Sequence, residues 1–163
     1  MTTPGEIVLN FTGEAPVNIE GMVEALGVEL ERKAELHPEI AGQIELLDDG
    51  RFKISINKND HYFRRRFTTA HELAHFLLHR NLIGRGLDDT KAYRSLNIGN
   101  FYNQSVTSQH EVEANRLASR LLMPKPLVQR YHAAMGGDRK DLAKKFQVSP
   151  EAMGYRLQAL GLA

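Results

Sequence analysis

No cysteine and no tryptophan occur among the 163 residues of the chain. Without cysteine the protein can form neither disulfide bonds nor thiolate zinc sites, so any metal ion must be held by His, Asp or Glu. The sequence also lacks an apolar run approaching the roughly 20 residues that span a bilayer, and its N-terminus lacks the basic start and apolar stretch of a signal peptide. We therefore expect a cytoplasmic protein with no membrane segment.

Neither basic nor acidic residues are in excess, because 21 basic and 20 acidic residues leave a formal net charge of +1. Such a balance gives no general reason to expect binding to nucleic acid or to an anionic membrane. Local basic clusters do occur, at residues 64–66 ("RRR") and near the C-terminus. The arginines at 64–66 are compatible with holding an acidic substrate segment or with pairing to acidic turns, and we favour the structural role.

What the chain does have is the size and composition of one compact domain, with 42% hydrophobic residues. We predict a single domain over residues 1–163, with an N-terminal extension at 1–17 and a C-terminal helical segment at about 138–160. Asn18 is a candidate N-cap for a short helix that ends near Leu26.

Strands and longer helices follow along the chain. The segments "GQIELL" and "RFKISIN" flank the turn residues "DDG" (48–50) and predict two strands joined by a tight turn. From about Phe67 the apolar residues recur at helical spacing. A second helix is predicted to run from about Ser108 to Leu122, with Ser108 as N-cap and Glu111 completing a capping box. The expected fold class is α+β, with a small, mostly antiparallel sheet packed on a helical body.

The helix that starts near Phe67 carries His71, Glu72 and His75 in the spacing H-E-x-x-H. Residues four apart on an α-helix lie on the same side, so both imidazoles can converge on one ion. Imidazole nitrogens are zinc ligands, and a catalytic zinc site has three protein ligands and one open position. Glu72, next to the first histidine, is then placed to act as general base. The motif predicts a zinc site.

A third ligand has to come from elsewhere in the chain. His79 lies about 12 Å along the helix axis from His71, too far for both to bind one ion comfortably, so we expect a supporting or capping role for it. In the segment "EVEAN", Glu111 and Asn115 are four residues apart and share a helix face. We therefore predict Glu111 as the third ligand and Asn115 as its support, with Glu113 as the alternative ligand.

The segments "RRRFTTAHELAHFLLH" and "EVEANRLASRLLMP" resemble two motifs of the ImmA/IrrE family of zinc metallo-endopeptidases. The resemblance covers about residues 18–160. It implies a zincin-like fold with Zn2+ between the H-E-x-x-H helix and a second, glutamate-bearing helix. Carried over by matching positions, it implies that His71, His75 and Glu111 are zinc ligands and that Glu72 is the catalytic carboxylate.

The resemblance also implies a substrate, namely a specific helix-turn-helix transcriptional repressor whose cleavage relieves repression in mobile-element, phage or stress control. The alternative is a non-catalytic, zinc-containing regulator that binds a repressor, which a fourth protein ligand such as His79 or His110 would favour. Direct binding to nucleic acid is the less favoured interpretation, because basic helix faces are more often simply solvated. Tyr93, Tyr102 and His110 are candidates for stabilising the oxyanion.

Overall fold

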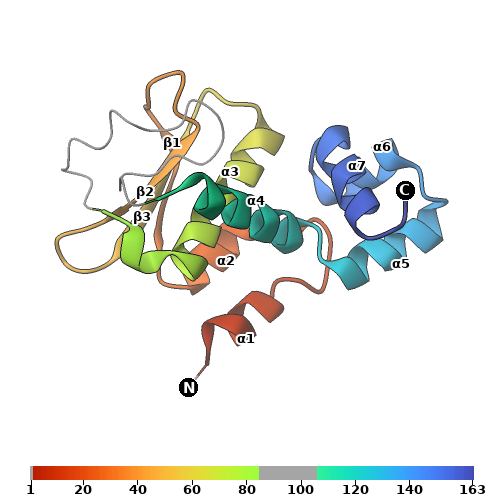
Figure 1. Ribbon diagram of the computed structural model, residues 1–163, viewed down its shortest axis with the longest axis horizontal. Coiled ribbons are helices and arrows are strands. Elements are labelled where there is room, and N and C mark those ends of the chain that lie inside the picture. Colours follow the sequence, from red (N-terminus) through yellow and green to blue (C-terminus); the bar gives the residue numbers. More distant parts are fainter. Residues whose placement is uncertain (1, 85–105) are drawn as a thin grey trace.

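A computed structural model describes residues 2–84 and 106–163 of the chain and shows an α+β fold, as predicted (Figure 1). Three strands form one sheet: β1 (Glu29–Ala34), β2 (Gly42–Leu46) and β3 (Phe52–Asn57). The helices are α1 (Pro4–Leu9), α2 (Ile19–Ala25), α3 (Tyr62–Leu78), α4 (Ser108–Leu122), α5 (Lys125–Met135), α6 (Arg139–Phe146) and α7 (Pro150–Ala159), with a short 3-10 helix at Arg80–Leu82. Within the described ranges, no helix has the length and apolarity needed to cross a membrane.

The sheet is mixed, with strand order β1-β3-β2. β2 and β3 are antiparallel, as the segments on either side of the 48–50 turn predict, whereas β1 and β3 are parallel. The parallel pairing arises because residues 35–41 cross the end of β3 before β2 begins. There the buried side chain of Asn57 donates hydrogen bonds to the carbonyls of His37, at 3.1 Å, and Ile40, at 2.9 Å. The expected mostly antiparallel sheet thus has one pairing of each kind.

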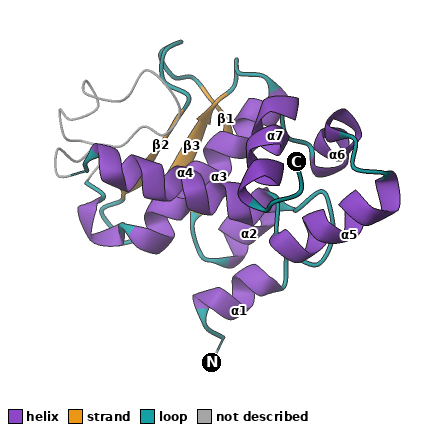
Figure 2. Ribbon diagram, turned by 45° about the vertical axis from the view of Figure 1, so that its right-hand side comes forward, coloured by secondary structure: helices purple, strands orange, loops and turns teal. Residues whose placement is uncertain are grey.

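Helix α3 lies between the sheet and α4, and it contacts β2 and β3 on one side and α4 on the other (Figures 1 and 2). Helices α5, α6 and α7 gather at the end of the molecule away from the sheet (Figure 1). One hydrophobic core nevertheless joins all these parts. Its fully buried members include Ile44, Ile54, Leu73, Leu122, Leu142, Phe146 and Met153. Because α3 is packed on both sides, side chains on its inner faces are held in fixed directions.

Several predicted helix boundaries agree with the structure. The Asn18 side chain accepts a hydrogen bond from the Gly21 amide at 3.0 Å and caps α2. The predicted C-terminal helical segment contains α6 and α7. Two helices were not predicted: α1, which lies in the N-terminal extension, and α5, whose first turn contains a proline. Proline is tolerated at a helix start, so "MPKP" ends one helix and begins the next.

The capping box predicted for α4 at Ser108 and Glu111 is wrong by one residue. Thr107 has extended backbone angles, and its Oγ1 accepts a hydrogen bond from the His110 amide at 3.3 Å. Nδ1 of His110 in turn accepts one from the Thr107 amide at 2.9 Å. Histidine takes the place of the glutamate usual in this motif. The Glu111 side chain is therefore not used for capping.

Arg66, the last of the three arginines at 64–66, is buried. Its guanidinium donates hydrogen bonds to the carbonyls of Val17, at 3.0 Å, and Gln147, at 3.2 Å. It therefore joins the segment before α2 to the end of α6. The structural role expected for the cluster holds for Arg66, but its partners are backbone carbonyls and not the carboxylates of an acidic turn.

Candidate metal centre

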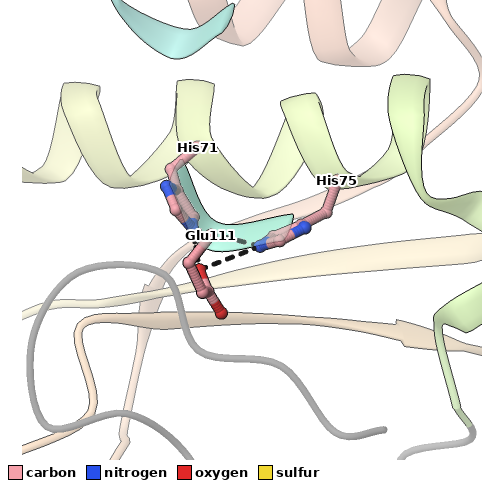
Figure 3. Close-up of side chains that lie close together, drawn as sticks. All are labelled: His71, His75 and Glu111. Carbon is pink, nitrogen blue, oxygen red and sulfur yellow. Dashed lines mark hydrogen bonds and ion pairs between the residues drawn. The ribbon is translucent and has the colours of Figure 1, made fainter. Parts of the chain in front are cut away.

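His71 and His75 project from the same side of α3, one helical turn apart (Figure 3). Both rings are buried, with exposures of 0% and 1%. Their Nε2 atoms lie 3.1 Å apart. Because α3 is packed between the sheet and α4, the tertiary fold fixes the convergence that the H-E-x-x-H spacing predicts.

Glu111 completes this group from α4 (Figure 3). Its Oε1 atom lies 2.8 Å from Nε2 of His71 and 3.2 Å from Nε2 of His75. One ligand atom from each of the three residues lies within 4.8 Å of the others, an arrangement that could hold one metal ion. Glu113, the alternative considered from the sequence, contacts neither of these two histidines through any hydrogen bond or ion pair among the described residues.

The donor set fits zinc, for which two imidazole nitrogens and a carboxylate oxygen are common ligands. Three lone-pair-bearing atoms this close together repel one another unless protons or a cation lie between them. In addition, Oε2 of Glu111 is buried and has no hydrogen-bond partner within the described part of the chain. A cation at the centre of the group would relieve the repulsion and satisfy the buried carboxylate.

Electrostatics favour the protonation states that a metal requires. Burial lowers the pKa of His75, and the neighbouring ring of His71 acts in the same direction. Burial alone would raise the pKa of Glu111, but its close contacts with the His71 and His75 rings outweigh burial and hold that pKa below its ordinary value. At neutral pH a neutral His75 therefore faces an ionised Glu111, and these are the forms that bind metal ions.

Asn115 lies one turn after Glu111 on α4 and contacts the first histidine. Its Oδ1 atom is 2.7 Å from Nδ1 of His71. An amide oxygen can only accept a hydrogen bond, so Nδ1 of His71 carries the proton and Nε2 keeps its lone pair toward Glu111. The structure thus places Asn115 behind the histidine and not behind the carboxylate.

Glu72, the remaining residue of the motif, is fully buried at 0% exposure. A buried carboxylate is costly, so its presence next to His71 in the core calls for a function. Of the oxyanion candidates, His110 caps α4, while Tyr93 and Tyr102 lie outside the described residues.

Sequence reasoning found no partner for His79, which the structure places directly behind His75. Nδ1 of His79 lies 3.0 Å from Nδ1 of His75, and its Nε2 lies 2.8 Å from Oε1 of Glu113. The hydrogen bond with His79 lowers the pKa of Glu113. His79 is the C-cap of α3 and follows His75 by four residues, and this spacing was a usable signal for the first of these contacts.

A family model and a solved structure match the chain. The model of Peptidase_M78, described as an IrrE N-terminal-like domain, matches residues 41–158 and so includes all of α3 and α4. A comparison with curated proteins found no match. A solved structure titled "Mycobacterium tuberculosis transcriptional regulator" is similar, with a TM-score of 0.59 and 16% sequence identity. That match covers 95% of this chain and 46% of the other, and at this identity it concerns the fold alone.

Proposed function

The chain belongs to the Peptidase_M78 family of IrrE N-terminal-like domains, and we propose that it is a zinc-dependent endopeptidase. Family membership supports a metallopeptidase or a regulator of the IrrE type. One observation favours an enzyme over a non-catalytic regulator. His71, His75 and Glu111 converge on one point, and a buried glutamate, Glu72, lies beside the first histidine.

In this proposal His71, His75 and Glu111 hold the zinc ion. When bound, zinc supplies a Lewis acid that polarises a peptide carbonyl and makes water a better nucleophile. Glu72 takes a proton from the attacking water and returns it to the nitrogen of the leaving amine, so that a C–O bond forms as the C–N bond breaks. Because Glu72 is buried, little bulk water competes for that proton.

We further propose that the substrate is a helix-turn-helix transcriptional repressor, cleaved at one site in the cytoplasm. The support for this choice is that both motifs, around His71 and around Glu111, resemble the ImmA/IrrE family. The similar solved structure supports the fold only, and the chain spans 46% of its length.

The geometry gives less support to a non-catalytic regulator with a closed zinc site. Such a site usually has four protein ligands. In the described part of the chain, neither His79 nor His110 joins the group of His71, His75 and Glu111. The position that a substrate or water molecule needs is therefore not taken by either histidine.

The test is a cleavage assay with matched variants. Protein loaded with one equivalent of zinc is incubated with each helix-turn-helix repressor encoded beside it, and the products are identified by intact mass. We expect one discrete cut with the wild type and none with Glu72→Gln, which keeps the ligand set. Equal behaviour of the two proteins, or no cleavage of any such repressor by protein with stoichiometric zinc, would contradict the proposal.

A further inference from the structure

A line of three polar side chains runs from the surface to the candidate metal centre. It begins at Glu113 on α4, whose Oε1 is 2.8 Å from Nε2 of His79. It continues from Nδ1 of His79 to Nδ1 of His75, at 3.0 Å. Nε2 on the opposite side of the His75 ring then faces Nε2 of His71, at 3.1 Å, and Oε1 of Glu111, at 3.2 Å.

The carboxylate of Glu113, the outermost group of the line, determines which nitrogen atoms donate in these hydrogen bonds. A carboxylate can only accept, so Nε2 of His79 carries a proton and donates it to Glu113. Neutral His79 then has an unprotonated Nδ1, which accepts a hydrogen bond from Nδ1–H of His75. Nε2 of His75 is left with its lone pair directed toward Glu111. If His79 instead donated to Nδ1 of His75, the proton of neutral His75 would be on Nε2, where a lone pair is needed to bind a metal ion.

We propose that Glu113 and His79 are a positioning pair, which holds His75 in the ring orientation and protonation state that bind zinc and thereby raises zinc affinity. The inference rests on the zinc centre of the proposed function. Residues behind a metal-bound histidine commonly act in this way, by fixing its tautomer and increasing its basicity. Here the support comes from two side chains in series.

Burial along the line suits this role. His79 is 8% exposed, so its ring is held in place by the surrounding protein. The Glu113 side chain is 41% exposed, so its charge keeps much of its hydration. The two metal-binding histidines are therefore supported differently: His71 by the neutral amide of Asn115, and His75 by a chain that ends in a charge.

The same neighbourhood could be taken for a second metal site, because ligand atoms of His79, His110 and Glu113 lie within 4.8 Å of one another. The capping box of α4 argues against it. Nδ1 of His110 accepts a hydrogen bond from the Thr107 amide at 2.9 Å, so Nε2 of a neutral His110 carries the proton and cannot bind a metal. A metal there would break both the cap and the hydrogen bond between His79 and Glu113.

Zinc affinity of the full chain, measured by competition with a chromophoric chelator, tests the positioning pair. We expect His79→Ala and Glu113→Ala to weaken zinc binding by about 10–100-fold while leaving one site per chain. His79→Gln should recover most of the loss, because its amide oxygen can accept from His75 and its amide nitrogen can donate to Glu113. His110→Gln is the control, since glutamine at this position keeps the capping box, and its affinity should equal that of the wild type.

A second measurement reads the protonation of His79 directly. Nitrogen-15 chemical shifts of the imidazoles in zinc-loaded protein should show the proton of His79 on Nε2, with its Nδ1 accepting the hydrogen bond from His75. A proton on Nδ1 of His79 would overturn the proposal, as would wild-type affinity in Glu113→Ala. Two zinc ions per wild-type chain, one of them lost in His110→Gln, would also overturn it in favour of a second metal site.

These outcomes separate the positioning pair from the proposed enzyme. A wild-type chain that binds no zinc at all would overturn both. Normal zinc binding in the wild type and unchanged binding in Glu113→Ala would overturn the positioning pair alone. Zinc affinities that follow the expected order support the pair even if no repressor is cleaved, a result that would count only against the proposed peptidase.

Discussion

His71 and Asn115 are 44 residues apart in the chain, and Nδ1 of the first lies 2.7 Å from Oδ1 of the second. Asn115 follows Glu111 by one turn on α4, so this helix supplies both a candidate ligand atom and the group that orients a second candidate ligand, His71. Relative movement of α3 and α4 would disturb both contacts together. The packing of these two helices is therefore part of the candidate metal centre.

We expect Asn115→Leu to weaken zinc binding by about 10–100-fold, because leucine has a similar volume but cannot accept the hydrogen bond from His71. Asn115→Asp keeps an acceptor oxygen at the same place and should bind zinc more tightly than Asn115→Leu. Both variants are to be compared by chelator competition. Equal affinities for the leucine variant and the wild type would show that the orientation of His71 does not depend on this contact.

Metal content per chain distinguishes the two glutamates of α4. His71→Ala and Glu111→Ala each remove one of the three proposed ligand atoms, and we expect both to lose zinc during purification. Glu113→Ala should still contain one zinc ion per chain when zinc is saturating, since Glu113 does not reach the centre. Mass spectrometry of native protein gives the count. Zinc lost in Glu113→Ala at saturation but kept in Glu111→Ala would reverse the assignment.

Zinc should stabilise the folded chain, because the ligand atoms come together only when α3 and α4 pack. Zinc at about 100 times its dissociation constant adds about 2.7 kcal/mol to the free energy of unfolding. For a domain of this size, that corresponds to a rise in Tm of about 5–10 °C. Calorimetry with and without zinc measures the shift, and His71→Ala should abolish it. The same shift in His71→Ala would mean that zinc binds elsewhere.

The candidate site was largely predictable from the sequence because helical periodicity fixes direction locally. Residues four apart share a face whatever the rest of the fold, which is why His71 and His75 converge, and why Glu111 and Asn115 do. The contact between His79 and Glu113 could not be predicted in the same way. It depends on the relative rotation and offset of α3 and α4, which only tertiary packing determines.

The pairing of the strands was likewise predictable only in part. Alternating residues around the 48–50 turn predicted the pairing of β2 with β3, because a short turn forces neighbouring strands to be antiparallel. The place of β1 depends on the crossing of residues 35–41, which the amide of Asn57 holds through carbonyls far away in the sequence. No sequence pattern around a buried asparagine at a strand end indicates which carbonyls its side chain will contact.

Gly42→Ala should loosen the packing of α3 on the sheet. A Cβ atom at residue 42 would lie 2.5 Å from Cγ2 of Thr68 and 3.1 Å from the carbonyl oxygen of Ser55. Overpacking of this kind costs about 1–3 kcal/mol of unfolding free energy. Thr68 lies one turn before His71, so zinc affinity should fall as well. Gly13→Ala is the control for urea denaturation, because a Cβ there meets no atom within 4 Å.

Arg66→Met tests whether the buried arginine holds the two ends of the fold together. The substitution keeps an apolar stem but leaves the carbonyls of Val17 and Gln147 without their donor. Hydrogen bonds from a charged group contribute about 1.5–3 kcal/mol, and we expect a loss of that size in the free energy of unfolding measured with urea.

Arg64→Met is the matched control on the same helix. Arg64 is 47% exposed and pairs with Asp60 at 3.5 Å, so its replacement should change the free energy by no more than about 0.5 kcal/mol. Equal losses in the two variants would mean that removing positive charge from the start of α3, and not the contacts of Arg66, accounts for the effect.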